Sequence, residues 1–193
     1  MRRFVVVSLT ASANGKFSLE DLPGSGGRVD ILCRCVGAAL LVSHGIRKDS
    51  EIHLVILTDR ANPRTISIRG DKVRSLNPDE RTTASLLRIA LGRQNEMETS
   101  PGVIIRNVGL PVLLDELRST KLYLLEEGGE DARKALASIR MDDDATFLLG
   151  ARDDMPRDLR DLCISLGAKT ISISPLSLQS EQCITIVHNI LDG

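Results

Sequence analysis

The sequence predicts an α/β fold with a mostly parallel sheet flanked by helices. Two observations support this class. Short apolar runs rich in β-branched residues alternate along the chain with longer segments of helical spacing. The chain is also long enough, at 193 residues with 42% hydrophobic and 26% charged residues, to bury a sizeable core without disulfides. Disordered, collagen-like and disulfide-rich proteins have different compositions and are excluded.

The alternation defines each element in order. The predicted strands are residues 4–9, 52–57, 65–68, 103–105, 122–125, 146–149 and 170–173. The predicted helices are residues 29–42, 79–91, 111–118, 156–166 and 181–191. Residues 93–102 are polar and are the best candidate for a loop. Because no repeat and no linker interrupts this pattern, we expect one domain over residues 1–193.

Two predicted helices have unusual surfaces. Residues 29–42 are apolar on nearly every face, which is typical of a helix packed on both sides. Residues 181–191 carry a stripe of apolar side chains at helical spacing. Each of these surfaces can belong to the core or to a subunit interface.

Charge is distributed unevenly along the chain. Residues 1–93 have a net charge of +6 and residues 94–193 a net charge of −7, although the whole chain has −1. Arg outnumbers Lys by 19 to 6, which suits bidentate recognition of phosphate, although genomic composition explains it equally well. Since the chain has no Trp, one Tyr and three Phe, a single-strand binder that stacks successive bases is disfavoured.

The cysteine and histidine spacings indicate no metal site. None of the four cysteines forms a C-x-x-C pair, and none of the three histidines has a partner at metal-ligand spacing. The longest apolar run, residues 35–42, is too short to span a bilayer. We therefore expect a reduced cytoplasmic protein with no metal and no membrane segment.

A glycine-rich segment precedes the first long helix. Residues 24–27 read Gly-Ser-Gly-Gly but match neither dinucleotide-binding nor P-loop spacing, so we interpret them mainly as a flexible loop. Arg28, Asp30 and Arg34 follow directly. Asp30 and Arg34 are spaced for an ion pair within the helix, but a charge amid apolar neighbours also suits phosphate binding.

Two further segments have the pattern of helix boundaries. Asn77 is a predicted N-cap, with Pro78 at the first helical position and Glu80 placed for a capping box. Ser43-His44-Gly45 resembles a helix end with Gly in the left-handed conformation.

The last two predicted strands end in residues suited to a ligand. Gly150 ends one strand, and a Ser-Pro turn within residues 172–178 ends the next before a helix begins near Ser180. Ligands of open α/β sheets bind outside the carboxyl ends of the strands, where glycine permits close approach of the backbone. These positions are therefore candidates for a binding site.

Several motifs together resemble a known family. They are residues 21–30, Cys33-Arg34-Cys35, residues 43–49, residues 77–81, residues 100–103 and the final segment 183–192. In order and over essentially the whole chain, they resemble the tRNA pseudouridine-54 N1-methyltransferases of the SPOUT class.

The resemblance implies S-adenosylmethionine as methyl donor, the T arm of tRNA as substrate, a homodimer and a C-terminal trefoil knot. It places the cofactor pocket on a set of strand-end residues: Leu124, Gly150, Ile173, Ser174, Pro175, Leu176, Ser177, Leu178 and Cys183. The chain departs from the family pattern at Ala151-Arg152, where Asp-His is common, and at Gln179-Ser180, where His-Ala is expected. Both departures replace side-chain hydrogen-bonding groups that the family pattern places near the pocket.

The implied chemistry is an in-line displacement in which the pseudouridine N1 attacks the sulfonium methyl group, so alignment of the two reactants dominates catalysis. Asp30 is the candidate for taking the N1 proton or orienting the uracil edge, and Arg28 and Arg34 for holding phosphate or a carbonyl oxygen. Arg47 and Arg81 are further candidates for RNA contacts. N1 is already a nucleophile, so we assign Cys183 to the pocket wall. The alternatives are an enzyme acting on ribosomal pseudouridine and a catalytically weak RNA-binding homologue.

Overall fold

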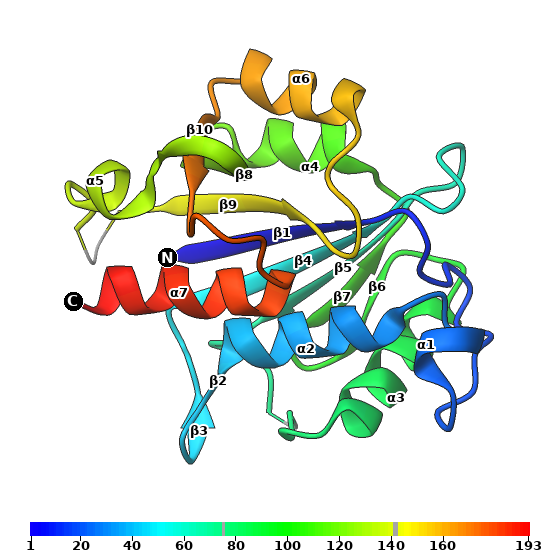
Figure 1. Cartoon of the computed structure of the whole chain (residues 1–193). Coiled ribbons are helices and arrows are strands. Elements are labelled where there is room, and N and C mark those ends of the chain that lie inside the picture. The colour runs from blue at the N-terminus through cyan, green and yellow to red at the C-terminus, as the bar shows by residue number, and fades with distance from the viewer. Residues whose placement is uncertain (75, 141–142) are drawn as a thin grey trace.

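The protein is described by a computed structural model that covers residues 1–74, 76–140 and 143–193 (Figure 1). Within these ranges one eight-stranded sheet forms the centre, with strand order β10-β8-β9-β1-β4-β5-β7-β6. Its strands are β1 (Arg2–Ser8), β4 (Ser50–Ile56), β5 (Arg64–Arg69), β6 (Met97–Ser100), β7 (Val103–Arg106), β8 (Lys121–Asp131), β9 (Ala145–Gly150) and β10 (Lys169–Ser172). A small antiparallel hairpin, β2 (Leu41–Val42) and β3 (Gly45–Ile46), stands apart from it.

Helices cover both faces of the sheet. They are α1 (Leu22–Ser25), α2 (Val29–Leu40), α3 (Glu80–Leu91), α4 (Leu110–Leu117), α5 (Ala132–Leu136), α6 (Arg157–Ser165) and α7 (Ser180–Asp192). Figure 1 shows α4 and α6 above the sheet, and α2, α3 and α7 below it. Among the described residues, no helix has both the length and the apolar character needed to cross a bilayer.

The prediction of a mostly parallel sheet is confirmed. Strands β10, β8, β9, β1 and β4 run parallel to one another, whereas β5, β7 and β6 add antiparallel pairs at one edge. The carboxyl ends of β1, β8, β9 and β10 consequently meet at one edge of the sheet, as the strand-end argument requires.

Three local predictions were wrong. The helix predicted over residues 29–42 ends at Leu40, because the chain turns into the β2–β3 hairpin. In that hairpin His44 rather than Gly45 takes the left-handed conformation, with φ of 61°. The predicted loop at residues 93–102 contains β6, a short edge strand whose polar residues carry no strand pattern.

The N-cap of α3 also differs from the prediction. Asp79, not Asn77, caps the helix, and its Oδ1 accepts a hydrogen bond of 2.7 Å from the Thr82 backbone N–H. The carboxylate outcompetes the amide because it lies directly before the first helical residue and carries the charge that a helix N-terminus favours.

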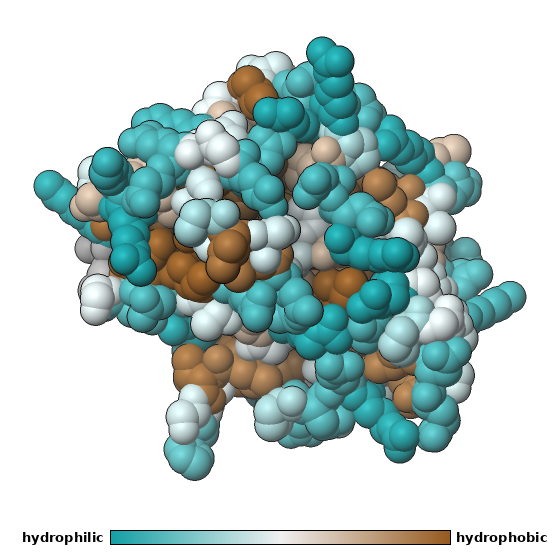
Figure 2. All heavy atoms as spheres, in the orientation of Figure 1, coloured by the Kyte–Doolittle hydropathy of each residue, from teal (hydrophilic) through white to brown (hydrophobic). Residues whose placement is uncertain are grey.

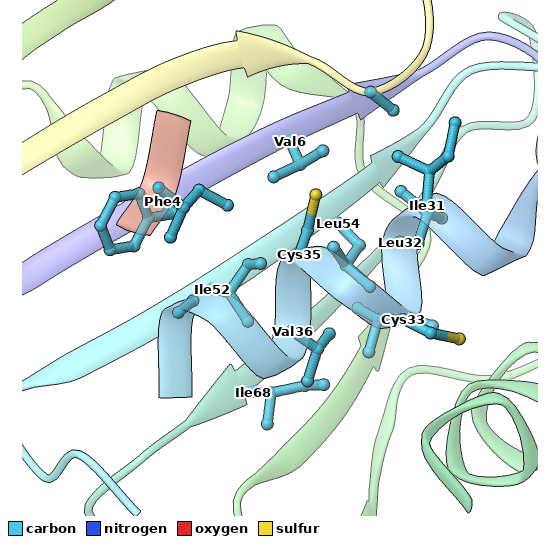
Figure 3. Packing of buried hydrophobic residues seen from close by; sticks show 14 of the residues in the cluster. Phe4, Val6, Ile31, Leu32, Cys33, Cys35, Val36, Ile52, Leu54 and Ile68 are labelled. Carbon is cyan, nitrogen blue, oxygen red and sulfur yellow. The ribbon is translucent and has the colours of Figure 1, made fainter. Parts of the chain in front are cut away.

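Helix α2 packs against the centre of the sheet (Figure 3). Leu32 and Val36 of α2 are fully buried, as are Phe4 of β1 and Ile52 of β4. Because α7 and α3 contact α2 on other sides, most of its surface is covered, which confirms the expectation of a helix packed on both sides. Arg34 stands out as a partly exposed charged residue on this helix.

Helix α7 is attached to β1 through a buried histidine. The Nε2 of His188 lies 3.1 Å from the Ala39 carbonyl oxygen, and its Nδ1 lies 3.2 Å from a guanidinium nitrogen of Arg2. An arginine can only donate and a carbonyl can only accept, so His188 is neutral with its proton on Nε2. Burial, with the charges of Arg47 and Arg2, lowers the pKa of His188 to about 4, from 6.5.

This histidine makes stability dependent on pH. The unfolded chain protonates His188 near its ordinary pKa, whereas the folded chain resists protonation, so stability is complete above pH 6.5 and is lost as pH falls towards 4. The difference in pKa corresponds to about 3 kcal/mol. We expect urea unfolding at pH 7 and pH 4.5 to show this loss in the native chain and a smaller loss in His188→Gln. The exposed hairpin variant His44→Asn is the control and should keep the native pH dependence.

Candidate functional site

A cavity lies where the carboxyl ends of β8, β9 and β10 meet the start of α7; we call it the strand-end cavity. Its volume is about 150 Å³. Seven of the predicted cofactor residues line it: Gly150, Ile173, Ser174, Leu176, Ser177, Leu178 and Cys183. Two do not: Leu124 is buried in the core on the α4–α6 side of the sheet, and Pro175 is exposed outside the lining.

The segment after β9, residues 151–156, forms one wall of the cavity. Hydrogen bonds to β1 and to the start of α7 hold it in place. The Ala151 N–H donates to the Val7 carbonyl over 2.8 Å. The Ser180 hydroxyl donates to the carbonyl oxygen of Gly150 over 2.8 Å and also bonds that of Ala151. A Cβ at Gly150 would lie 2.1 Å from the Asp153 carbonyl oxygen, so this close turn requires glycine.

The cavity lining also contains acidic residues that the strand-end argument missed. Glu126 and Glu127 line the cavity where β8 continues past its predicted end, and Asp154 lines it from the segment after β9. The sequence signal was present, since the acidic residues directly follow an apolar strand. The extension of β8 depends on its contact with β10, where Gly129 lies against the Ile171 backbone.

A second hollow, which we call the arginine groove, adjoins the cavity. It has a volume of about 320 Å³. Arg28, just before α2, and Ile31 and Arg34 of α2 line one side, and residues 151–152 and 177–181 line the rest. The two hollows share lining residues: Ala151, Arg152, Ser177, Leu178 and Ser180. A molecule in one hollow can therefore contact a molecule in the other.

Asp30 lies behind the arginine groove and joins its two arginines. Its Oδ1 accepts from Arg28 Nε and its Oδ2 from Arg28 Nη2, both at 3.0 Å. The same Oδ2 accepts from Arg34 Nη1 at 3.0 Å, which is the ion pair expected within the helix. Asp30 is 4% exposed and is not part of the groove lining, whereas both arginines are.

Arg34 also connects α2 to the start of α7. Its Nε donates to Glu181 Oε1 over 2.7 Å, and its Nη1 lies 3.3 Å from Glu80 Oε1 of α3. Burial alone would raise the pKa of Asp30, but the hydrogen bonds from Arg28 and Arg34 outweigh it and lower that pKa below its usual value. At neutral pH the network is thus a fixed ionised cluster with its cations towards the groove.

The glycine-rich segment before α2 has a structural role. Asp21 accepts hydrogen bonds from the backbone N–H groups of Gly24 and Ser25, at 3.0 and 2.9 Å, so those donors are occupied. Gly27 has φ of 61°, and a Cβ there would lie 2.0 Å from the Thr10 carbonyl oxygen. These contacts hold Arg28, itself left-handed with φ of 72°, at the mouth of the groove.

The two other predicted RNA contacts lie away from the groove. Arg47 forms a two-pronged ion pair with Asp192, at 3.1 and 2.8 Å, at the far end of α7 from Glu181. Arg81 is 63% exposed on α3 and lies 3.0 Å from Glu20. Within one chain, therefore, neither residue joins the cluster of Arg28 and Arg34.

Cys183 lies in the cavity wall as a free thiol. Burial raises the pKa of its thiol, which keeps it protonated and weakly nucleophilic at neutral pH. Within the described ranges, no group of three or more His, Cys, Asp or Glu side chains is placed to hold a metal ion.

The combination of a mostly parallel α/β sheet, a cavity at its strand ends and a facing arginine groove is that of a protein that brings a small ligand against an anionic partner. The chain belongs to the family of SAM-dependent RNA methyltransferases, whose model matches residues 1–193.

Curated relatives and a solved structure agree with this membership. A tRNA (pseudouridine(54)-N(1))-methyltransferase of Methanosarcina acetivorans is 42% identical, with 100% of this chain and 91% of the relative covered. A protein of the same name from Methanopyrus kandleri is 39% identical, with 100% of this chain and 93% of the relative covered. The crystal structure of Archaeoglobus fulgidus Nep1 bound to S-adenosylhomocysteine has the same fold, with a TM-score of 0.69, 16% identity, and coverage of 99% of this chain and 97% of that one.

Proposed function

We propose that this chain methylates N1 of pseudouridine 54 in the T loop of tRNA, with S-adenosylmethionine as donor. The observation that carries the proposal is the continuity of the strand-end cavity with the arginine groove, which allows a donor methyl group to face an RNA base. The names of the relatives, at 42% and 39% identity over the whole chain, support this substrate.

The cavity fits the donor in shape and charge. The close backbone turn after Gly150, which requires glycine because a Cβ would lie 2.1 Å from the Asp153 carbonyl oxygen, shapes the cavity at the β9 end. Glu126, Glu127 and Asp154 supply negative charge beside a cationic sulfonium, and the turn at residues 173–178 supplies backbone groups for an adenine edge. The bound donor would supply a methyl group whose carbon a nitrogen nucleophile can attack, with S-adenosylhomocysteine as the leaving group.

The groove residues align the base. Arg28 and Arg34 line the groove beside the shared wall and can hold a phosphate or a uracil carbonyl oxygen with paired N–H groups. Their guanidinium planes are fixed by Asp30, so little rotamer entropy is lost when RNA binds. Such fixed alignment is the main requirement of an in-line displacement.

Of the two roles considered for Asp30, the geometry favours orientation. Its lowered pKa makes it a weak base near neutral pH, and its carboxylate lies behind the two arginines and outside the groove lining. Asp30 is therefore proposed as a positioning residue that acts through Arg28 and Arg34. The N1 proton becomes acidic as the new N–C bond forms, and solvent in the open groove can accept it.

We also propose a homodimer, supported by a hollow with an apolar floor and a polar rim beside the arginine groove. Its apolar lining residues are Cys33, Gly37, Ala38, Leu41 and Pro78, and its polar ones are Arg34, Asn77, Asp79, Glu80, Thr83 and Glu181. Figure 2 shows apolar atoms gathered below α2 and towards β2. Light scattering should give twice the mass of one chain.

A C-terminal trefoil knot is the third part of the proposal. Helix α7 lies on the opposite face of the sheet from α6, and the segment between β10 and α7 runs against residues 150–151, where Ser180 is bonded (Figure 1). That path is what a chain threaded past the β9–α6 connection requires.

We also propose a cytoplasmic location, because the proposed substrate is tRNA.

The substrate is tested with labelled donor and four RNAs: tRNA and ribosomal RNA, each with and without pseudouridine. We expect methyl transfer only to tRNA that contains pseudouridine 54, and nuclease digestion followed by mass spectrometry should locate the methyl group on N1. Transfer to ribosomal RNA alone would replace the substrate, and RNA binding without transfer would indicate a catalytically weak homologue.

A further inference from the structure

The segment after β9 carries opposite charges that face the same cavity. Arg152 and Asp154 are two residues apart, and both line the strand-end cavity. They do not form an ion pair with each other: the acidic partner of Arg152 is Asp153, at 3.7 Å, and both of these side chains are more than half exposed. Arg152 and Asp154 thus contribute a cation and an anion to the same cavity lining.

The charge of Arg152 differs in sign from that of the other charged residues in the lining. Arg152 is the one basic residue among the described residues that line the cavity, against the acids Glu126, Glu127 and Asp154. Glu126 is engaged by Arg160, with 2.7 Å between Oε1 and Nε. Within the described part of the chain, Glu127 and Asp154 form no ion pair.

The backbone that carries Arg152 and Asp154 is held firmly. The contact of Gly150 with the Asp153 carbonyl, the bonds of Ser180 to the carbonyls of Gly150 and Ala151, and the burial of Met155 all hold this segment against the sheet. The backbone positions that carry the two charges are consequently fixed, which lowers the entropy lost on binding.

S-adenosylmethionine has a matching pair of charges. Its sulfonium carries the methyl group, the adenosyl group and a short chain that ends in an ammonium and a carboxylate. Transfer requires the donor's methyl group to face the arginine groove. Only a short carbon chain joins the sulfonium to the donor's amino-acid end, so that end must lie near the wall that the two hollows share. Arg152 is part of that shared wall.

We propose that Arg152 binds the carboxylate and Asp154 the ammonium of the donor's amino-acid end. This inference rests on the proposed function and adds a donor subsite to it. It also gives a function to the Ala151-Arg152 departure from the family pattern, since the side chain at position 152 provides a charged contact.

Calorimetry with two probes tests the subsite. S-adenosylhomocysteine retains the amino-acid end, whereas 5′-methylthioadenosine lacks it and keeps the adenosyl and thioether groups. Arg152→Ala should weaken binding of S-adenosylhomocysteine by about tenfold or more, as expected for loss of a hydrogen bond to a charged group. Binding of 5′-methylthioadenosine should change by less than about twofold. Asp154→Asn should show the same contrast, and Arg152→Lys should restore part of the affinity.

Arg157→Ala is the matched control, because Arg157 is 92% exposed on α6 and lines neither hollow. Equal losses for both probes in Arg152→Ala would overturn the proposal, since they would indicate a distorted cavity. Unchanged binding of S-adenosylhomocysteine with weakened tRNA binding would overturn it in favour of a phosphate contact. If the native chain binds neither probe, the proposed function itself fails, and the two failures are thereby distinguished.

Discussion

Gly150→Ala should lower the affinity for S-adenosylhomocysteine by about ten- to hundredfold. The new Cβ would lie 2.1 Å from the Asp153 carbonyl oxygen, a backbone atom that cannot move by rotating a side chain. Residues 151–156 must shift, and forcing an extra carbon into a packed site costs about 1–3 kcal/mol. That shift displaces the wall shared by the strand-end cavity and the arginine groove. Calorimetric titration measures the loss.

Gly45→Ala provides the control for this variant. Gly45 lies in the β2–β3 hairpin, where an added Cβ would meet Val42 at 3.7 Å, an ordinary contact. Thermal unfolding of both variants separates lost binding from lost folding. Native affinity in a folded Gly150→Ala protein would show that the donor binds elsewhere than at the β9 end.

Asp30→Asn should reduce the rate of methyl transfer to tRNA by roughly a hundredfold, the size of effect that a small misplacement of an aligning group produces. The amide keeps the shape of the side chain but replaces an acceptor oxygen with a donor nitrogen that faces a guanidinium. Arg28 then loses its bidentate partner, whereas Arg34 keeps Glu181 and Glu80. We expect kcat to fall and the affinity for S-adenosylhomocysteine to stay within about twofold.

The readouts separate positioning from other roles. A group that acts as the base should give a pH–rate profile that loses a limb in Asp30→Asn, whereas a positioning residue should leave the shape of the profile unchanged. Asp115→Asn, at a residue that is 71% exposed on α4 and lines neither hollow, is the matched control and should keep native turnover. Native kcat in Asp30→Asn would remove Asp30 from the alignment machinery.

The contacts around α7 show where the motif comparison was incomplete. Gln179-Ser180 was expected to lack hydrogen-bonding groups that relatives place near the pocket. Instead, the Ser180 hydroxyl bonds two carbonyls of the cavity wall, and the Gln182 side chain accepts from the Gln179 N–H over 2.9 Å at the start of the helix. The hydroxyl stabilises the wall itself, which a comparison of side chains alone cannot reveal.

The sequence by itself determined the fold class, the principal elements and part of the lining of the strand-end cavity. These features follow from local patterns: apolar alternation reports strands and helices, and parallel strands bring their carboxyl ends to one edge. Gly150 and residues 173–178 were identifiable for this reason. The Arg28–Asp30–Arg34 cluster was also visible, because its members lie within seven residues of one another.

Only the tertiary structure decided which charges meet. Arg34 finds Glu181 at a separation of 147 residues, and Arg47 finds Asp192 at 145, so no local spacing predicts either pair. The first contact joins α2 to the start of α7 beside the cavity, and the second removes Arg47 from the groove. Electrostatic contacts depend on distance in space, which the sequence constrains only over a few residues. The packing of α7 on α2 therefore decides that Arg34 lies at the site and that Arg47 forms a structural ion pair away from it.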